Sequence, residues 1–159
     1  MKVKRITQAG ALLLMLGAPV FIFVFFYLFG ENHYELPHEG RYEITPAHDT
    51  TYMAVPVKSF SYLNRGKVHI VMLSDSLPPQ EAGEQWQRLQ AYFQTSKTVV
   101  LHRAAPDSLT LAWLCPHHNY RQTPFVLIDK QGFVRGHYGS DMEEYDRLIT
   151  ETLIAVKLP

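Results

Sequence analysis

The sequence predicts an α/β domain with a mixed sheet, preceded by one hydrophobic helix. The middle of the chain alternates apolar, β-branched strand segments with an amphipathic helix, which is the pattern of a parallel βαβ unit. Two further strand segments then flank a tight turn, and an amphipathic helix closes the chain. The 15 Lys plus Arg balance the 15 Asp plus Glu, so the composition gives no reason to expect nucleic acid binding.

Residues 9–30 form an apolar segment without a charged residue. As a helix this segment would be about 33 Å long, enough to cross a hydrocarbon core of about 30 Å. Lys2, Lys4 and Arg5 precede it, so the positive-inside rule predicts that residues 1–8 are cytoplasmic. A cleaved signal peptide is the alternative, but the run is long and the bulky residues 27–30 do not suit a cleavage site. We expect a single-pass protein of the bacterial inner membrane that contacts lipid through residues 9–30, with a periplasmic soluble domain.

Residues 31–58 are rich in Pro, His, Tyr and Glu. Proline holds the residue before it extended, so this stretch predicts an extended tether that lies over the domain formed by residues 59–159. His33, His38 and His48 are scattered through it and are interpreted as spacer residues, with transient metal binding as the alternative.

The first half of the domain predicts strand, helix, strand and connector. Residues 66–73 and 98–101 have strand composition, a helix is expected from Pro79 to about Gln94, and residues 107–114 read as a short helical or irregular stretch. Asp75 or Ser76 is expected to cap the long helix. One face of that helix carries an apolar stripe, formed by Ala82, Trp86, Leu89 and Phe93.

The second half predicts a hairpin and a closing helix. Strands at 125–128 and 133–138 flank the turn 129–132, and Ser140 with Glu143 forms an S-x-x-E capping box before the last helix. Glu143, Glu144 and Asp146 are interpreted as acidic residues that favour the positive end of that helix. The order strand, helix, strand, connector, strand, strand, helix is the thioredoxin-like architecture.

Two segments of the chain carry a family resemblance, FSYLNRGKVHIV at residues 60–71 and LIDKQGFVRGHY at residues 127–138. The first resembles the F-x-F-x-N…G-K-x-x-V segment, and the second the L-I-D-x-x-G-x-I-R-G-x-Y hairpin, of the Sco (SenC/PrrC) family of copper-insertion factors. The resemblance covers about Leu36 to Leu158. It implies a membrane-anchored thioredoxin-like protein that delivers copper to, or reduces, the binuclear copper site of cytochrome c oxidase. Thioredoxin-like folds also place a cis proline before the hairpin, where this chain has Pro124.

The family's C-x-x-x-C motif is missing from this chain. The matching residues 74–80 contain no cysteine, and Cys115 is the only cysteine of the sequence, so no internal disulfide can form. Serine and aspartate cannot replace the soft thiolates that cuprous copper prefers. We therefore expect a non-catalytic accessory or assembly subunit without a cofactor, whose partner is a respiratory membrane complex such as cytochrome c oxidase or its assembly factors.

Cys115, His117 and His118 are the candidate metal ligands. They are close in sequence and precede the hairpin, where the resemblance implies a histidine that His118 matches best. A structural turn is the favoured interpretation of this segment. The alternatives are a residual copper chaperone that uses Cys115 and His118, or a redox partner in which Cys115 alone forms mixed disulfides.

Other residues are assigned structural roles. His69 and His137 fall in predicted strands and are interpreted as sheet residues. Pro124, Gly132 and Gly136 are expected to shape the hairpin and its approach.

Overall fold

The computed structural model describes residues 15–25, 27, 35–46, 49–75 and 79–158. The chain divides into two compact units, Met1–Glu35 and Leu36–Pro159. In the first unit, residues 15–25 and 27 are helical. Within the described ranges, no helix is both long enough and apolar enough to cross a membrane. The span predicted for residues 9–30 lies partly outside the described residues.

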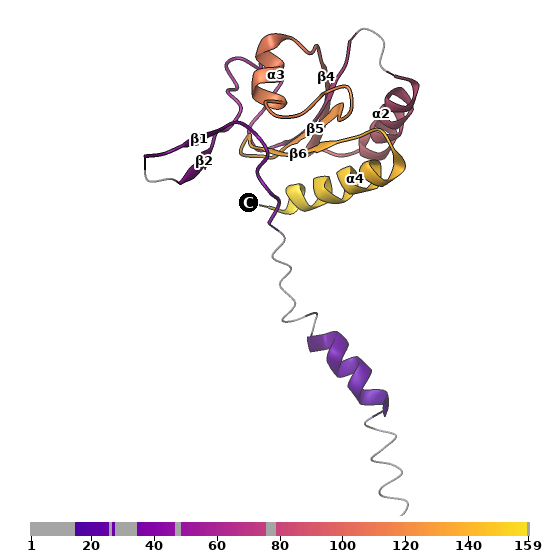
Figure 1. Cartoon of the computed structure of the whole chain (residues 1–159). Coiled ribbons are helices and arrows are strands. Elements are labelled where there is room, and N and C mark those ends of the chain that lie inside the picture. Colours follow the sequence, from indigo (N-terminus) through magenta and orange to yellow (C-terminus); the bar gives the residue numbers. More distant parts are fainter. Residues whose placement is uncertain (1–14, 26, 28–34, 47–48, 76–78, 159) are drawn as a thin grey trace, which may run out of the picture. The chain divides into compact units, whose positions relative to one another are not determined.

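The second unit is built on a four-stranded mixed sheet (Figure 1). Its strands β3 (Val68–Leu73), β4 (Val99–Ala104), β5 (Phe125–Ile128) and β6 (Val134–Tyr138) have the spatial order β4-β3-β5-β6. β3 and β4 are parallel, while β5 is antiparallel to both β3 and β6. Along the chain, α2 (Gln80–Phe93) follows β3, α3 (Ser108–Leu114) follows β4, and α4 (Met142–Lys157) follows the β5–β6 pair, which is the predicted order. This topology is thioredoxin-like, so the predicted fold class of the domain is confirmed.

Each face of the sheet is covered by its own apolar cluster. α2 and α4 lie on one face, and the predicted stripe of α2 is buried there against alternate residues of β3 and β5. α3 covers the other face together with Val55, Phe60 and Leu63 from the segment before β3. All six residues of β3 and all four of β5 are buried, so both faces of these strands are covered, which explains why they are apolar throughout except for His69.

The segment predicted as a tether contains structure of its own. β1 (Tyr42–Ile44) and β2 (Thr50–Tyr52) pair as an exposed antiparallel hairpin, and Leu36 and Val55 are buried in the two core clusters. The compact unit therefore begins at Leu36 rather than at residue 59. Each strand has only 3 residues, all of them exposed, which is too short for a strand pattern to be recognised in the sequence.

The helix caps differ from expectation at two places. α4 is capped by Asp141, whose Oδ1 accepts from the backbone N of Glu144 at 3.0 Å, so the predicted capping box of Ser140 and Glu143 is wrong by one residue. α2 starts after Pro79 without a side-chain hydrogen bond at its N-cap, and Ser76 lies outside the described residues. α3 is capped by Asp107, whose Oδ1 accepts from the backbone N of Thr110 at 2.7 Å.

The β5–β6 hairpin depends on two glycines. Gly132 has a φ of +92°, a conformation that favours glycine in the turn. At Gly136, an added Cβ would lie 2.6 Å from Cζ of Tyr138, so only glycine leaves room for that buried ring. No peptide bond among the described residues is cis, and the Thr123–Pro124 bond is therefore trans.

Candidate functional site

A cavity of about 320 Å³ opens at the end of β3, where the Sco-type motif would place its cysteines. Apolar residues form part of its wall, and its polar groups come from the end of β3 and the loop before β5. Tyr120 donates from its hydroxyl to Asp75 Oδ2 at 3.4 Å, and Arg121 Nε donates to Tyr120 Oη at 3.3 Å. Its described lining is Leu73, Ser74, Asp75, Pro79, Ala82, Tyr120, Arg121 and Pro124.

The described lining of this cavity offers no soft metal ligand, because it includes neither cysteine nor histidine. Cuprous copper prefers thiolates, so these residues do not fit copper as the resemblance would imply. The loop before β5 reaches this cavity with Tyr120 and Arg121, and His118 is not among the described lining residues. The arrangement can form hydrogen bonds and an ion pair with a bound group, but it holds no thiol.

Cys115 lies at the C-cap of α3, and its side chain is buried in the apolar cluster between α3 and the sheet. Burial raises the pKa of its thiol to about 12, so almost none of it is thiolate at neutral pH. The residue is 5% exposed, which leaves an incoming disulfide no access. This geometry argues against both alternatives that used Cys115, the copper chaperone and the monothiol partner.

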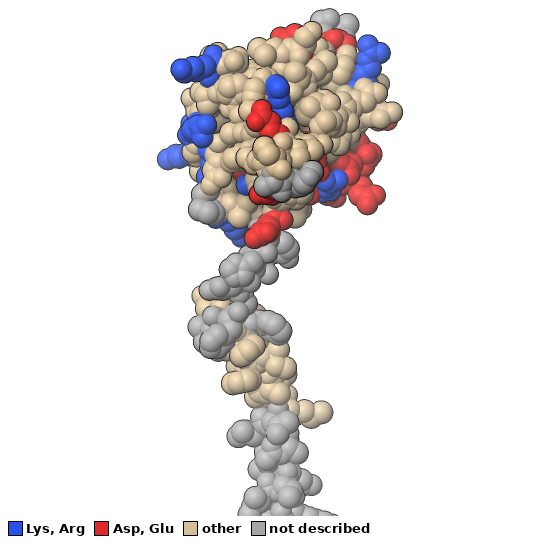
Figure 2. Space-filling view, turned by 60° about the vertical axis from the view of Figure 1, so that its left-hand side comes forward, with Lys and Arg blue, Asp and Glu red and all other residues tan. Residues whose placement is uncertain are grey.

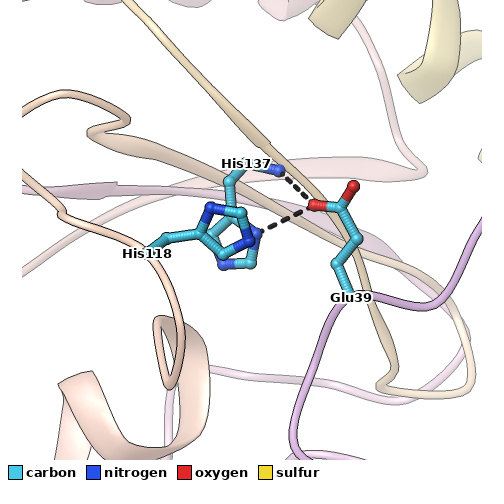
Figure 3. A group of neighbouring side chains, drawn as sticks. All are labelled: Glu39, His118 and His137. Carbon is cyan, nitrogen blue, oxygen red and sulfur yellow. Dashed lines mark hydrogen bonds and ion pairs between the residues drawn. The ribbon is translucent and has the colours of Figure 1, made fainter.

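A different cluster forms at the edge strand β6, where Glu39, His118 and His137 meet (Figure 3). The side chain of His137 is fully buried, and its Nδ1 lies 3.0 Å from Oε2 of Glu39. The backbone N of His137 donates to the same oxygen at 3.1 Å. The ring of His118 stacks on that of His137, with 4.0 Å between centroids and 19° between planes.

The protonation of the cluster follows from its partners. His137 Nε2 faces the carbonyl oxygen of Leu114, which can only accept, so Nε2 carries a hydrogen. Burial acts to raise the pKa of Glu39, but the hydrogen bond and charge of His137, together with the charges of His118 and Arg147, lower that pKa overall, so the carboxylate is ionised. Burial, then the charge of His137, lowers the pKa of His118, which favours its neutral form.

Neighbouring contacts fix the segment that carries Glu39 onto β6. The backbone N of Glu39 donates to the carbonyl of Val134 at 3.0 Å. Arg135 donates to the carbonyl of Leu36 at 2.9 Å and pairs with Asp129 at 2.6 Å. His38 lies 3.2 Å from Arg135 and packs on Phe133, so it is not the exposed spacer that the sequence suggested.

The predicted ligand set is thus only partly brought together. His118 belongs to the cluster, whereas His117 contacts the ring of Tyr42 and Cys115 is in no group of three or more potential ligands among the described residues. His137 is a sheet residue, as expected, and also a member of the cluster. Glu39 was missed, because it lies 98 positions from His137 in a segment without a strand or helix pattern. His33 and His48 lie outside the described residues.

The second predicted sheet histidine, His69, makes a separate buried contact. Its Nδ1 lies 3.1 Å from Nε2 of His102 on the neighbouring strand, and its Nε2 lies 2.8 Å from the carbonyl oxygen of Asn64. Both ring nitrogens have protein partners, which identifies His69 as a structural residue of the sheet.

No family model matches the sequence, and no curated protein matches it. Solved structures with a similar chain path include the solution structure of a candidate protein disulfide isomerase from Bacteroides thetaiotaomicron. It is 16% identical, with a TM-score of 0.44 over 78% of this chain and 89% of that one. Another is BsSco, a member of the Sco family of cytochrome c oxidase assembly proteins, at 12% identity and a TM-score of 0.44 over 81% of this chain and 98% of that one. At this level of similarity neither decides a function, and the fold assignment rests on the sheet topology.

The fold and the cavity together define the class: a thioredoxin-like α/β protein whose described cavity at the end of the first core strand holds no thiol. Its surface gives no strong electrostatic signature on the face drawn in Figure 2, where basic and acidic residues are interspersed among uncharged ones.

Proposed function

We propose that this protein is an accessory or assembly protein of a respiratory membrane complex such as cytochrome c oxidase, and that it acts by binding rather than by thiol chemistry. In this proposal residues 9–30 anchor the chain in the bacterial inner membrane and the thioredoxin-like domain is periplasmic. The observation that carries it is the combination of a thiol-free cavity lining with a single cysteine buried in the core.

The cavity provides the binding element. It combines the apolar side chains of Leu73 and Ala82 with the carboxylate of Asp75 and the guanidinium of Arg121. Concave sites of this mixed kind bind by excluding water from apolar surface, while a few polar groups set orientation. An extended polypeptide segment of a partner with an acidic side chain for Arg121 would suit it.

The resemblance in residues 60–71 and 127–138 suggests which partners to test first. Both segments contribute to the core of the domain: Val68 and Ile70 lie at the centre of the sheet, and the turn 129–132 closes the hairpin. A chain that retains this scaffold without the cysteines suits a partner-binding role better than copper transfer by paired thiolates.

The test is genetic complementation with full-length variants in the source bacterium. Deletion of the gene for this protein is expected to lower the amount of assembled oxidase. A reintroduced copy of the wild-type protein or of Cys115→Ser is expected to restore that amount. Arg121→Glu, which reverses a charge at the cavity, is expected to fail, while Lys97→Glu, an exposed substitution on the turn after α2, is expected to succeed.

The same strains should be purified through a tag in mild detergent, with oxidase subunits quantified in the eluate. Loss of these subunits in Arg121→Glu but not in Lys97→Glu supports binding through the cavity. Failure of a folded Cys115→Ser variant to restore the oxidase would show that thiol chemistry is required and would contradict the proposal. So would normal oxidase levels in the deletion strain.

A further inference from the structure

Three potential metal ligands converge at β6 from separate parts of the chain. Glu39 precedes β1, His118 lies in the loop between α3 and β5, and His137 lies on β6. One ligand atom from each residue lies within 4.8 Å of the other two. Figure 3 shows the two imidazole rings stacked, with the Glu39 carboxylate at their side. The cluster is separate from the cavity at the end of β3, since none of its three residues lines that cavity.

His137 is oriented as a ligand before any ion binds. Its Nε2–H donates to the carbonyl oxygen of Leu114, which fixes the ring and directs Nδ1 toward Glu39. Histidines that bind metals usually donate their second ring N–H to a carbonyl or carboxylate in this way. Nδ1 and Glu39 Oε2 share one hydrogen across 3.0 Å, and an ion placed there would displace it to solvent.

The spacing of these atoms is close to that of a coordination sphere. With metal–ligand bonds of about 2.0–2.2 Å, neighbouring tetrahedral ligand atoms are about 3.3–3.6 Å apart, so His137 and Glu39 need move little. His118 must move more, because stacked rings direct their lone pairs nearly parallel instead of toward one point. His118 is exposed and therefore has room to rotate about its side-chain bonds.

The ligand types define the ion. Two imidazole nitrogens and one carboxylate oxygen suit a divalent ion of borderline softness, whereas cuprous copper requires soft sulfur ligands. Three protein ligands with one side at the surface leave a fourth position for water, the arrangement of an open zinc site. We propose that Glu39, His118 and His137 bind one such divalent ion, with Zn²⁺ as the best fit, and that the ion ties the segment before β1 to the edge strand β6.

The competing explanation is a purely structural clasp. Glu39 already accepts two hydrogen bonds from His137, one from its ring and one from its backbone, and these alone would hold the segment. This explanation gives His118 no necessary role. The exposed histidine therefore distinguishes the two explanations, and its neighbour His117, which is also exposed and outside the cluster, is the matched control.

The purified full-length chain in mild detergent is titrated with Zn²⁺, and binding is measured by isothermal calorimetry. A second titration with Co²⁺ detects binding by the visible absorption of the bound ion, and thermal unfolding is measured with and without Zn²⁺. Wild type is expected to bind one tight equivalent and to melt at a higher temperature with zinc. His118→Ala is expected to weaken that equivalent at least tenfold and to abolish the thermal shift, with its metal-free melting temperature unchanged. His117→Ala is expected to behave as wild type.

Glu39→Gln provides a second variant, because it keeps the size of the side chain while removing the charge. It is expected to weaken zinc binding at least tenfold as well. Absence of a tight equivalent in wild type overturns the proposal. It is also overturned if His118→Ala binds zinc as wild type does, or if His117→Ala weakens binding as much as His118→Ala, since the ion would then be held by other histidines of the chain.

Discussion

The Asp129–Arg135 pair is expected to contribute more to stability than any other charged contact described in the domain. Its Nε–Oδ2 distance is 2.6 Å, and the two side chains are only 11% (Arg135) and 4% (Asp129) exposed. Asp129→Asn keeps the Oδ1 acceptor for the backbone N–H groups of Gln131 and Phe133 but removes the charge. The substitution therefore tests the ion pair with little change to the turn.

The magnitude follows from burial. Removing one partner of a buried ion pair leaves the other charge desolvated and costs about 3–5 kcal/mol. Arg135 would keep the carbonyl of Leu36, the ring of His38 and the face of the Phe133 ring as partners, none of which carries a negative charge, so little compensation is available. A loss of this size is a large part of the about 5–15 kcal/mol that typically stabilises a domain.

Urea unfolding of the full chain in mild detergent, monitored by tryptophan fluorescence, measures this loss because Trp86 of α2 is buried against the sheet. The double variant Asp129→Asn/Arg135→Met is expected to recover part of it, since no unpaired charge then remains buried. Glu144→Gln is the control: its partner Arg147 is 42% exposed, and an exposed pair contributes under about 1 kcal/mol. A loss for Asp129→Asn no larger than that of Glu144→Gln would refute the reasoning.

Three further predictions concern the helix cap, the hairpin and a buried histidine. Asp141→Ala should destabilise the domain by about 0.5–2 kcal/mol and Ser140→Ala by almost nothing, and equal losses in chemical unfolding would contradict the observed cap. Gly136→Ala should cost about 1–3 kcal/mol because its methyl group overlaps the buried ring of Tyr138; an unchanged urea midpoint would show that the ring moves aside. Burial lowers the pKa of His69 below its usual 6.5, so the unfolded state binds more protons than the folded state. The stability that neutral His69 contributes is therefore complete above about pH 6.5 and is lost as the pH falls toward the folded-state pKa. Unfolding of His69→Gln should therefore depend less on pH between about 7.5 and 5 than that of wild type, and parallel curves would count against this assignment.

The core elements were predictable because their signals are local. β5 was predicted with its observed bounds, and the stripe on α2 is buried as its spacing indicated, because strand composition and helical periodicity depend on neighbouring residues. The α4 cap shows the limit of such signals. Ser140 and Asp141 can both cap a helix, and the choice depends on where the helix begins, which packing of the whole helix decides.

The candidate metal cluster could not be predicted from spacing. Glu39 and His137 meet only because the segment before β1 lies along β6, and that placement depends on the burial of Leu36 and on the hydrogen bond from Arg135 to the Leu36 carbonyl. Conversely, Cys115 and His118 are close in sequence but separate in role. Cys115 is the C-cap of α3 and is buried, whereas His118 lies in the loop that follows and is exposed.

The attachment of residues 36–39 to β6 also determines how the domain bears load. The chain enters the compact unit at Leu36, whose carbonyl accepts from Arg135, and the backbone N of Glu39 donates to Val134. Both bonds join this segment to β6, the last strand in the sheet order. Tension applied to the chain before Leu36 is therefore carried first by this junction and reaches the central strand β3 only after the junction yields. The mechanical strength of the domain in that direction is set at its edge strand, and a bound ion at Glu39 and His137 would raise it.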